Sequence, residues 1–116
     1  MKVEESRPFF VFVLIPVEHY FVYIIYSQTI DKYYIGETVD LDNRFEEHIS
    51  HKFSGSFTTR SVDWEIFLVL ECQSRTQARL VESHIKKMKS KTYIQNLKKY
   101  PELQEKLLSR YNTSHG

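Results

Sequence analysis

A nine-residue run of aromatic and β-branched residues, His19 to Ser27 (HYFVYIIYS), limits the possible folds more than any other feature. Residues of these types are enriched in β-strands. A polar stretch, Gln28 to Lys32, and a second short strand, Tyr33 to Gly36, follow it, which predicts a hairpin. A third apolar segment, Trp64 to Glu71 (WEIFLVLE), is almost continuous and predicts a central strand of the sheet.

Helical periodicity begins after the hairpin. Leu41, Phe45 and Ile49 recur at i, i+4 and i+8, which predicts a helix of about three turns starting near Asp40, with Thr38 or Asp40 as its cap. The following stretch, residues 52–63, contains Ser, Gly and Thr without periodicity and predicts a loop.

Three more helices are expected in the second half of the chain. Ser74 and Gln77 match a capping box, so a helix should run from there to about Lys89. A short helix is expected at residues 93–97, and Pro101 is a favourable first residue for a terminal helix with apolar positions at Leu103, Leu107 and Leu108. The order of elements predicts an α+β domain, a small three-stranded antiparallel sheet flanked by helices.

Length and composition indicate one globular domain. The chain has 116 residues, of which 41% are hydrophobic and 27% are charged. Cys72 is the single cysteine, so one chain forms neither a disulfide nor a cysteine-based zinc site, and a reducing, cytoplasmic location is expected. The apolar run Phe9 to Val17 is too short to span a bilayer. We divide the chain into an N-terminal extension (1–18) of open status, a main domain (19–98) and a C-terminal helix and tail (99–116).

Positive charge is concentrated in one part of the chain. The whole sequence carries only +1, but the stretch from Cys72 to Tyr100 holds eight basic residues and one acidic residue, a net charge of +7. A segregated positive patch suits phosphate binding, because neutralised phosphates release their counterions. A solvated lysine-rich helix face is the alternative explanation. The candidate nucleic-acid contacts are Arg75, Arg79, Lys86, Lys87 and Lys89.

Two tripeptides and two helical residues occur together in the main domain. Val-Tyr-Ile at 22–24 is followed by Tyr-Ile-Gly at 34–36, and Arg44 and His48 come next on the first expected helix. In this combination residues 19–98 resemble the GIY-YIG nuclease superfamily, especially its short stand-alone bacterial members. Phe21 stands where the family name has glycine, which the short members often lack.

The resemblance implies a metal-dependent endonuclease that hydrolyses phosphodiester bonds in DNA. The family has a tyrosine on each of its first two strands, an arginine and a histidine on its first helix, and a metal-binding glutamate on a later helix. Asn96, fourteen residues after the glutamate position, has about the spacing of a later asparagine of the family. The residues in the main positions are Tyr23, Tyr34, Arg44, His48 and Glu82.

The resemblance also implies a division of roles. One divalent cation, Mg²⁺ or Mn²⁺, would bind Glu82, a phosphate oxygen and water, since hard ions prefer oxygen ligands. Arg44 would offset the charge of the transition state. Tyr23, Tyr34 and His48 remain three candidates for the general base, because a tyrosine pKa of about 10 must be lowered and a histidine pKa of about 6.5 needs less adjustment.

The residues themselves add independent indications. Arg44 and His48 are four residues apart and therefore share one helix face. Glu82 lies beside the expected inward stripe of the second long helix, formed by Ala78, Val81, Ile85 and Met88. A carboxylate beside an apolar stripe is costly unless it is paired or bound to a metal. The alternative to metal binding is a salt bridge to Arg79, Lys86 or Arg44.

Other classes of function are less well supported. No histidine and cysteine pattern fits zinc, no nucleophile elbow accompanies the serines, and no glycine-rich loop indicates a nucleotide cofactor. The alternative is a non-catalytic nucleic-acid-binding domain with the same fold. A protein-interaction module with aromatic strands is a third possibility, which leaves Arg44, His48 and Glu82 unexplained.

The nuclease hypothesis makes two geometric predictions. Tyr23, Tyr34, Arg44 and Glu82 should converge on one concave surface, and the basic residues of the second long helix should border it. The sequence does not indicate which structure or sequence in DNA is preferred, branched DNA included, and it does not indicate the oligomeric state.

Overall fold

A computed structural model of the protein describes residues 19–49 and 57–112. The expected N-terminal extension, residues 1–18, lies outside the described residues. Residues 50–56, between the first helix and the third strand, also lie outside them. No helix in the described ranges is long and apolar enough to cross a membrane.

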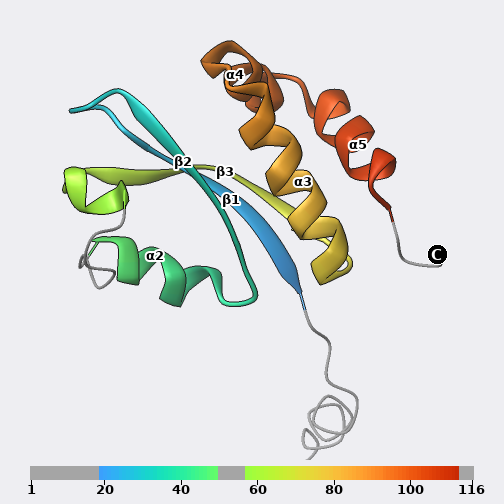
Figure 1. The fold of residues 1–116 in the computed structure, drawn as a ribbon, viewed down its shortest axis with the longest axis horizontal. Coiled ribbons are helices and arrows are strands. Elements are labelled where there is room, and N and C mark those ends of the chain that lie inside the picture. Colours follow the sequence, from blue (N-terminus) through green and yellow to red (C-terminus); the bar gives the residue numbers. More distant parts are fainter. Residues whose placement is uncertain (1–18, 50–56, 113–116) are drawn as a thin grey trace, which may run out of the picture.

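A three-stranded antiparallel sheet forms the centre of the domain (Figure 1). Its strands are β1 (Tyr20–Ser27), β2 (Lys32–Thr38) and β3 (Trp64–Cys72), in the order β2-β1-β3. The turn between β1 and β2 includes Asp31 at φ 53°, whose carboxylate accepts hydrogen bonds from Tyr26 and Lys91. The α+β class, the hairpin and the number of strands are as the sequence predicts.

The prediction that residues 64–71 form a central strand is wrong, because β3 lies at one edge and β1 occupies the centre. The middle position gives β1 a partner on both sides and makes four successive residues, 22–25, buried. The apolar character of β3 does not reflect burial on both faces, since Ile66 is 44% exposed. A register shift opposite Ile24 and Ile25 also interrupts the regular alternation of its side chains.

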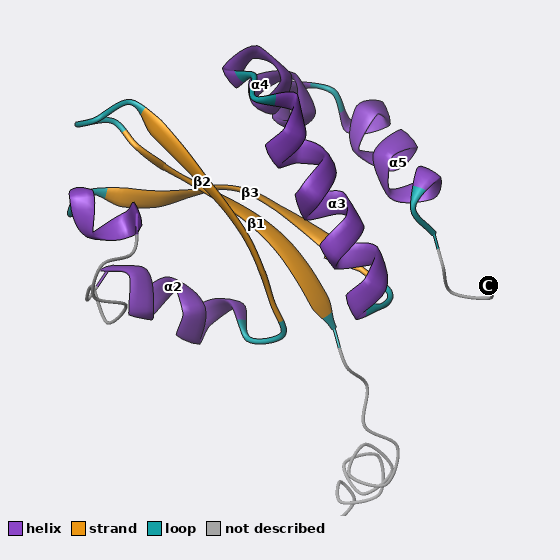
Figure 2. Ribbon diagram, viewed as in Figure 1, coloured by secondary structure: helices purple, strands orange, loops and turns teal. Residues whose placement is uncertain are grey.

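Four α-helices and one 3₁₀-helix complete the described chain (Figure 2). They are α2 (Leu41–Ile49), η1 (Phe57–Arg60), α3 (Arg75–Met88), α4 (Lys91–Lys99) and α5 (Pro101–Arg110). The 3₁₀-helix lies inside the segment predicted as a loop. Asp40 caps α2, because its carboxylate accepts the Asn43 backbone N–H at 3.1 Å.

Ser74 is the N-cap of α3, as predicted, but the reciprocal bond of the predicted capping box is made to Gln73, the residue before the cap. Ser74 Oγ accepts the Gln77 N–H at 3.0 Å, and the Gln77 side chain accepts the Gln73 N–H. Lys89 is the C-cap of the helix, and its φ of 49° is left-handed.

The helices cover the two faces of the sheet separately. α2 lies on one face and α3, α4 and α5 lie on the other (Figure 1). Because side chains of a strand alternate between faces, β1 sends Tyr23 and Ile25 toward α2 and sends Val22 and Ile24 toward α3. The two faces therefore have separate hydrophobic clusters, and the larger one lies under α3.

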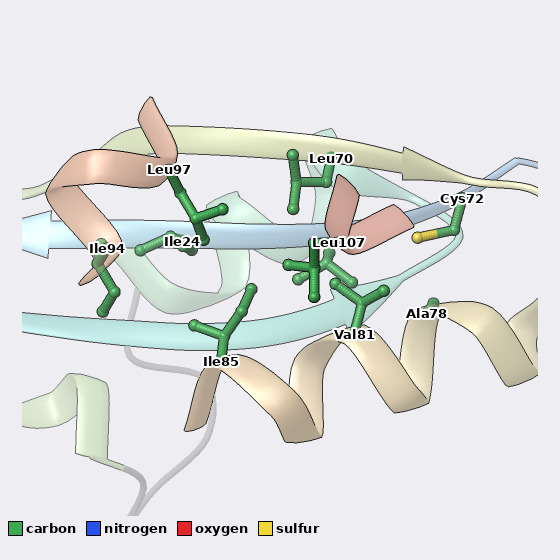
Figure 3. Packing of buried hydrophobic residues seen from close by; sticks show 10 residues of the cluster. Ile24, Leu70, Cys72, Ala78, Val81, Ile85, Ile94, Leu97 and Leu107 are labelled. Atoms are coloured by element: carbon green, nitrogen blue, oxygen red, sulfur yellow. The ribbon is translucent and has the colours of Figure 1, made fainter. Parts of the chain in front are cut away.

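Close packing of α3 on the sheet fixes the position of this helix. Ala78, Val81 and Ile85 point at the sheet and are at most 1% exposed (Figure 3). Met88 was predicted to continue this stripe but is 44% exposed, because it is the last residue of the helix and lies beyond the packed region. Glu82 is the neighbour of Val81 and lies at the border of the stripe, with 19% of its side chain exposed.

Candidate active site

The ring of Tyr23 lies directly over Gly36 on the neighbouring strand. These two residues are paired across β1 and β2. A Cβ atom added to Gly36 would lie 2.5 Å from Cζ of Tyr23, closer than such atoms ever approach in proteins. Glycine at this position therefore lets the Tyr23 hydroxyl group pass over β2, the edge strand of the sheet.

A chain of two buried hydrogen bonds orients the Tyr23 hydroxyl group. It lies 2.8 Å from Nε2 of His48, and Nδ1 of His48 lies 3.0 Å from Oγ1 of Thr58. His48 is 1% exposed and Thr58 is completely buried. The helix α2 thus supplies a histidine that connects β1 to the 3₁₀-helix η1.

Tyr34 belongs to the same cluster of rings. Its ring centroid lies 4.9 Å from that of His48 and 6.4 Å from that of Tyr23. Gly36 is two residues after Tyr34 on β2, so both face α2. The two predicted tyrosines and the predicted histidine therefore lie together on the α2 face.

Charged side chains act on the Tyr23 phenol from both helical layers. Burial raises the pKa of Tyr23 most, the neighbouring Tyr34 raises it further, and the positive charge of Arg44 lowers it. The carboxylates of Glu82 and Glu37 are also close enough to raise the pKa of this phenol. Arg44 comes from α2 and Glu82 from α3, so the surroundings of one hydroxyl group include residues from both helices.

His48 is held in its neutral form. Burial lowers its pKa, the Arg44 guanidinium lowers it further, and the Glu47 carboxylate opposes them. Arg44 itself lies 3.7 Å from Glu47, measured from Nε to Oε1, and its side chain is 38% exposed. Arg44 therefore remains accessible from solvent beside the buried tyrosine and histidine.

Glu82 lies in a hollow of basic side chains on α3. Its Oε2 atom pairs with Lys86 Nζ at 2.7 Å, which is one of the salt bridges considered from the sequence. Lys86 is 53% exposed, and exposed pairs of this kind are weak and easily exchanged. The residues lining the hollow are Arg79, Glu82, Ser83, Lys86, Lys87 and Lys89.

Four of the five predicted basic contacts thus surround Glu82, and Arg75 lies at the exposed start of α3, outside this lining.

The position of Asn96 gives it no link to the candidate site residues. It is half-buried in α4, and its backbone carbonyl group accepts the Tyr100 N–H. Among the described residues, no hydrogen bond or ion pair joins Asn96 to the tyrosines, Arg44, His48 or Glu82.

The oxygen donors that the protein offers at this site suit a hard divalent cation, but a substrate must supply some of the ligands. Within residues 19–49 and 57–112, no group of three or more His, Cys, Asp or Glu side chains is arranged to hold a metal. A largely buried carboxylate at Glu82, in a hollow open to solvent, fits an ion that takes its remaining ligands from water and phosphate.

Three residues of this arrangement were not among the candidate site residues predicted from the sequence. The close approach at Gly36 depends on a cross-strand neighbour, and Thr58 lies in a segment without periodicity. Glu37 had a detectable signal, since it continues the alternation of Tyr33 and Ile35 with a carboxylate where an apolar residue is expected.

Comparison with known proteins gives one match. The model of a family described as the GIY-YIG catalytic domain matches residues 19–98, which extend from β1 to the last turn of α4 and include every site residue described above. No curated protein and no solved structure matches the chain significantly.

Proposed function

The chain belongs to the GIY-YIG family, a nuclease family, and from this membership we propose that it is an endonuclease that hydrolyses phosphodiester bonds in DNA with one divalent cation, Mg²⁺ or Mn²⁺. The main support is the surroundings of the Tyr23 hydroxyl group. The hydroxyl group is hydrogen-bonded to His48, the Tyr23 ring lies 6.4 Å from that of Tyr34, and the charges of Arg44 and Glu82 act on the pKa of the phenol. A packed core alone does not require a buried tyrosine with a histidine partner and with charged side chains acting on it.

Arg44 and Glu82 have complementary roles in the proposed reaction. Glu82 holds the cation, which when bound polarises a phosphate oxygen and helps to neutralise the developing charge. Arg44 donates hydrogen bonds to the scissile phosphate, and its planar fork suits two oxygens of one phosphate. Its side chain is 38% exposed, so a substrate at the surface can reach it.

The Tyr23 and His48 pair is the proposed route for the proton of the attacking water. The phenol does not ionise by itself at neutral pH, because burial raises its pKa above the ordinary value. When Nδ1–H of neutral His48 donates to Thr58, the lone pair on Nε2 accepts the hydrogen bond from the Tyr23 hydroxyl group. As the water oxygen bonds to phosphorus and the bond to the 3′ oxygen breaks, Tyr23 takes the water proton and passes its own proton to His48.

The proposed activity is tested by incubating the purified protein with branched, nicked, single-stranded and duplex DNA in the presence of Mg²⁺ or Mn²⁺. We expect cleavage of at least one substrate and none with EDTA. Glu82→Gln keeps the size of the side chain and removes the charge that attracts the cation, so cleavage should fall by orders of magnitude. Arg44→Ala should lower the rate by about 10²–10³-fold.

Two comparisons keep this test specific. Glu105→Gln changes an exposed helical glutamate on α5 and should leave cleavage unchanged. DNA affinity without metal should persist in Glu82→Gln, because the basic residues around it remain. If Glu82→Gln cleaves like the wild type per folded molecule, Glu82 is an ion-pair partner of Lys86 and the metal assignment is wrong.

A non-catalytic nucleic-acid-binding domain is the second candidate, supported by the basic hollow on α3. Tight, salt-sensitive binding with no cleavage of any tested substrate would favour it.

A reducing, cytoplasmic location remains part of the main proposal, in agreement with the free thiol of Cys72, which is buried.

A further inference from the structure

Glu37 carries a buried oxygen atom that nothing in the described chain satisfies. Its Oε1 atom is inaccessible to solvent and has no hydrogen-bond partner, and it is the one such side-chain atom among the described residues. A buried carboxylate oxygen without a donor is destabilising, since it has lost water and gained nothing in exchange. This feature calls for a positively charged or hydrogen-bonding ligand that is not part of the protein.

The backbone places Glu37 on the face of the sheet that α3 covers. It pairs across the strands with Val22, which belongs to the core under α3. The thiol of Cys72, in the same core, has its pKa raised to about 11, by burial first and then by the negative charge of Glu37. Glu37 therefore lies on the face of the sheet that is covered by α3, the helix that carries Glu82.

Both carboxylates also lie near the same catalytic phenol. Glu82 and Glu37 each raise the pKa of Tyr23, whose hydroxyl group passes over Gly36, the residue before Glu37. One of the Glu82 oxygens is occupied by Lys86. Two carboxylates from different elements, β2 and α3, thus act on one phenol, and Glu37 lies on the face of the sheet that α3 covers.

We propose that Glu37 is a second carboxylate ligand of the catalytic cation, which it holds together with Glu82. This inference rests on the proposed nuclease function. Mg²⁺ is commonly bound through one or two carboxylates, with substrate phosphate and water completing its octahedron. A second carboxylate gives the ion a site before DNA arrives, whereas a single carboxylate leaves it dependent on the phosphate.

The test measures Mn²⁺ binding to the full chain without DNA, by titration calorimetry and by the loss of the free-ion EPR signal. The wild type should bind one Mn²⁺, and Glu37→Gln and Glu82→Gln should each weaken binding by about tenfold or more. Glu65→Gln, which changes an exposed glutamate of β3, is the matched control and should bind like the wild type. Mn²⁺ should raise the melting temperature of the wild type and of Glu65→Gln much more than that of Glu37→Gln.

A measurement on the unmodified protein covers the case in which Glu37→Gln does not fold. Bound Mn²⁺ broadens NMR signals of nearby nuclei, so the amide signals of Glu37 and Glu82 should broaden before those of Glu65 and Glu105.

Three results would overturn the inference. In the first, Glu37→Gln binds Mn²⁺ as tightly as the wild type does. In the second, the wild type binds no Mn²⁺ without DNA. In the third, Mn²⁺ leaves the amide NMR signal of Glu37 unbroadened. None of them contradicts the nuclease proposal, which fails separately if no metal supports cleavage of DNA.

Discussion

Tyr23 and His48 share a buried hydrogen bond in which burial favours the neutral form of both partners. Burial raises the pKa of the phenol and lowers that of the imidazole, so neither group carries a charge in the resting protein. A pair of this kind is stable until a substrate changes the local charge. The nearby Arg44 has the opposite effect on the phenol, since its positive charge favours the phenolate.

The lowered pKa of His48 predicts that acid destabilises the protein. Between the lowered pKa and the unfolded value of about 6.5, the unfolded chain binds more protons than the folded chain. The stabilisation is therefore complete above about pH 6.5 and declines as the pH falls. Urea unfolding from about pH 7.5 down to about pH 5 should show a smaller pH dependence in His48→Gln than in the wild type.

His84 requires a control in this experiment, because burial also lowers its pKa, helped by Arg110 and Lys87. It belongs to a separate cluster, in which Nδ1 lies 2.9 Å from the Tyr111 hydroxyl group. His84→Gln should therefore remove a separate part of the pH dependence, and the two effects should add. An unchanged pH dependence in His48→Gln would contradict the neutral imidazole on which the proposed proton route depends.

Gly36→Ala should separate the position of Tyr23 from its chemistry. The new methyl group would occupy space that the Tyr23 ring now fills, so the ring must move. We expect a loss of about 1–3 kcal/mol in unfolding free energy, typical of overpacking. Cleavage should fall about 10²-fold, because a displacement of about 1 Å in a catalytic group has effects of this size.

A double-mutant cycle provides the control for Gly36→Ala. In a Tyr23→Ala background the ring is absent, so adding the methyl group at position 36 should cost little stability. If Gly36→Ala is equally destabilising in both backgrounds, the strain arises in the backbone of β2 and the close approach of Tyr23 is not its cause.

At the scale of elements, Asp63 joins three segments that meet at one end of the sheet. Its carboxylate accepts hydrogen bonds from Ser27 at the end of β1 and from Ser61, just after η1, the latter at 2.6 Å. It also accepts the Thr29 backbone N–H at 3.0 Å and the Thr29 hydroxyl group at 2.9 Å. This arrangement holds η1 beside the hairpin, and η1 carries Thr58, the partner of His48.

Asp63→Asn should destabilise the protein at neutral pH but not in acid. Hydrogen bonds from Ser27 and Ser61 hold the pKa of Asp63 well below its usual range. A depressed carboxyl pKa contributes stability above the unfolded value of about 3.9, and this contribution is lost as the pH falls further. Thermal unfolding should show a gap between wild type and variant at neutral pH that narrows below about pH 4, and a constant gap would indicate a purely steric effect.

The accuracy of the sequence predictions depends on how local each signal is. The N-cap at Ser74, the proline at the start of α5 and the stripe of α3 depend on residues within a few positions. The structure has them as predicted, except for Met88 at the end of the stripe, which is exposed. The central place of β1 depends on which strands pair, and an apolar run such as residues 64–71 does not specify that. The residues of the candidate site were obtained through family resemblance, whereas the hydrogen bond from Tyr23 to His48 and the burial of Glu37 depend on tertiary packing.

At the scale of the whole molecule, the candidate site lies where two helical layers meet the β2 edge of one sheet. α2 supplies Arg44 and His48 from one face, and α3 supplies Glu82 from the other. The basic hollow around Glu82 is part of the same helix, so the helix that carries the proposed metal-binding residue also supplies positive charge next to it. The expected phosphate contacts therefore lie beside the residue that is proposed to hold the cation.

The salt dependence of DNA binding should reveal whether these basic residues contact phosphates. Each phosphate neutralised by a cationic side chain contributes about −0.9 to the slope of log affinity against log salt on duplex DNA. Arg79→Gln combined with Lys87→Gln should therefore make the slope less steep by about 1.8 if both side chains contact phosphates. Lys98→Gln combined with Lys99→Gln removes the same charge from α4, outside the hollow, and should change the slope less. Fluorescence anisotropy without divalent metal, so that no substrate is cut, measures both slopes. Equal slopes for the two double variants would mean that the protein attracts DNA through its general positive charge, and the hollow on α3 would then have no special part in binding.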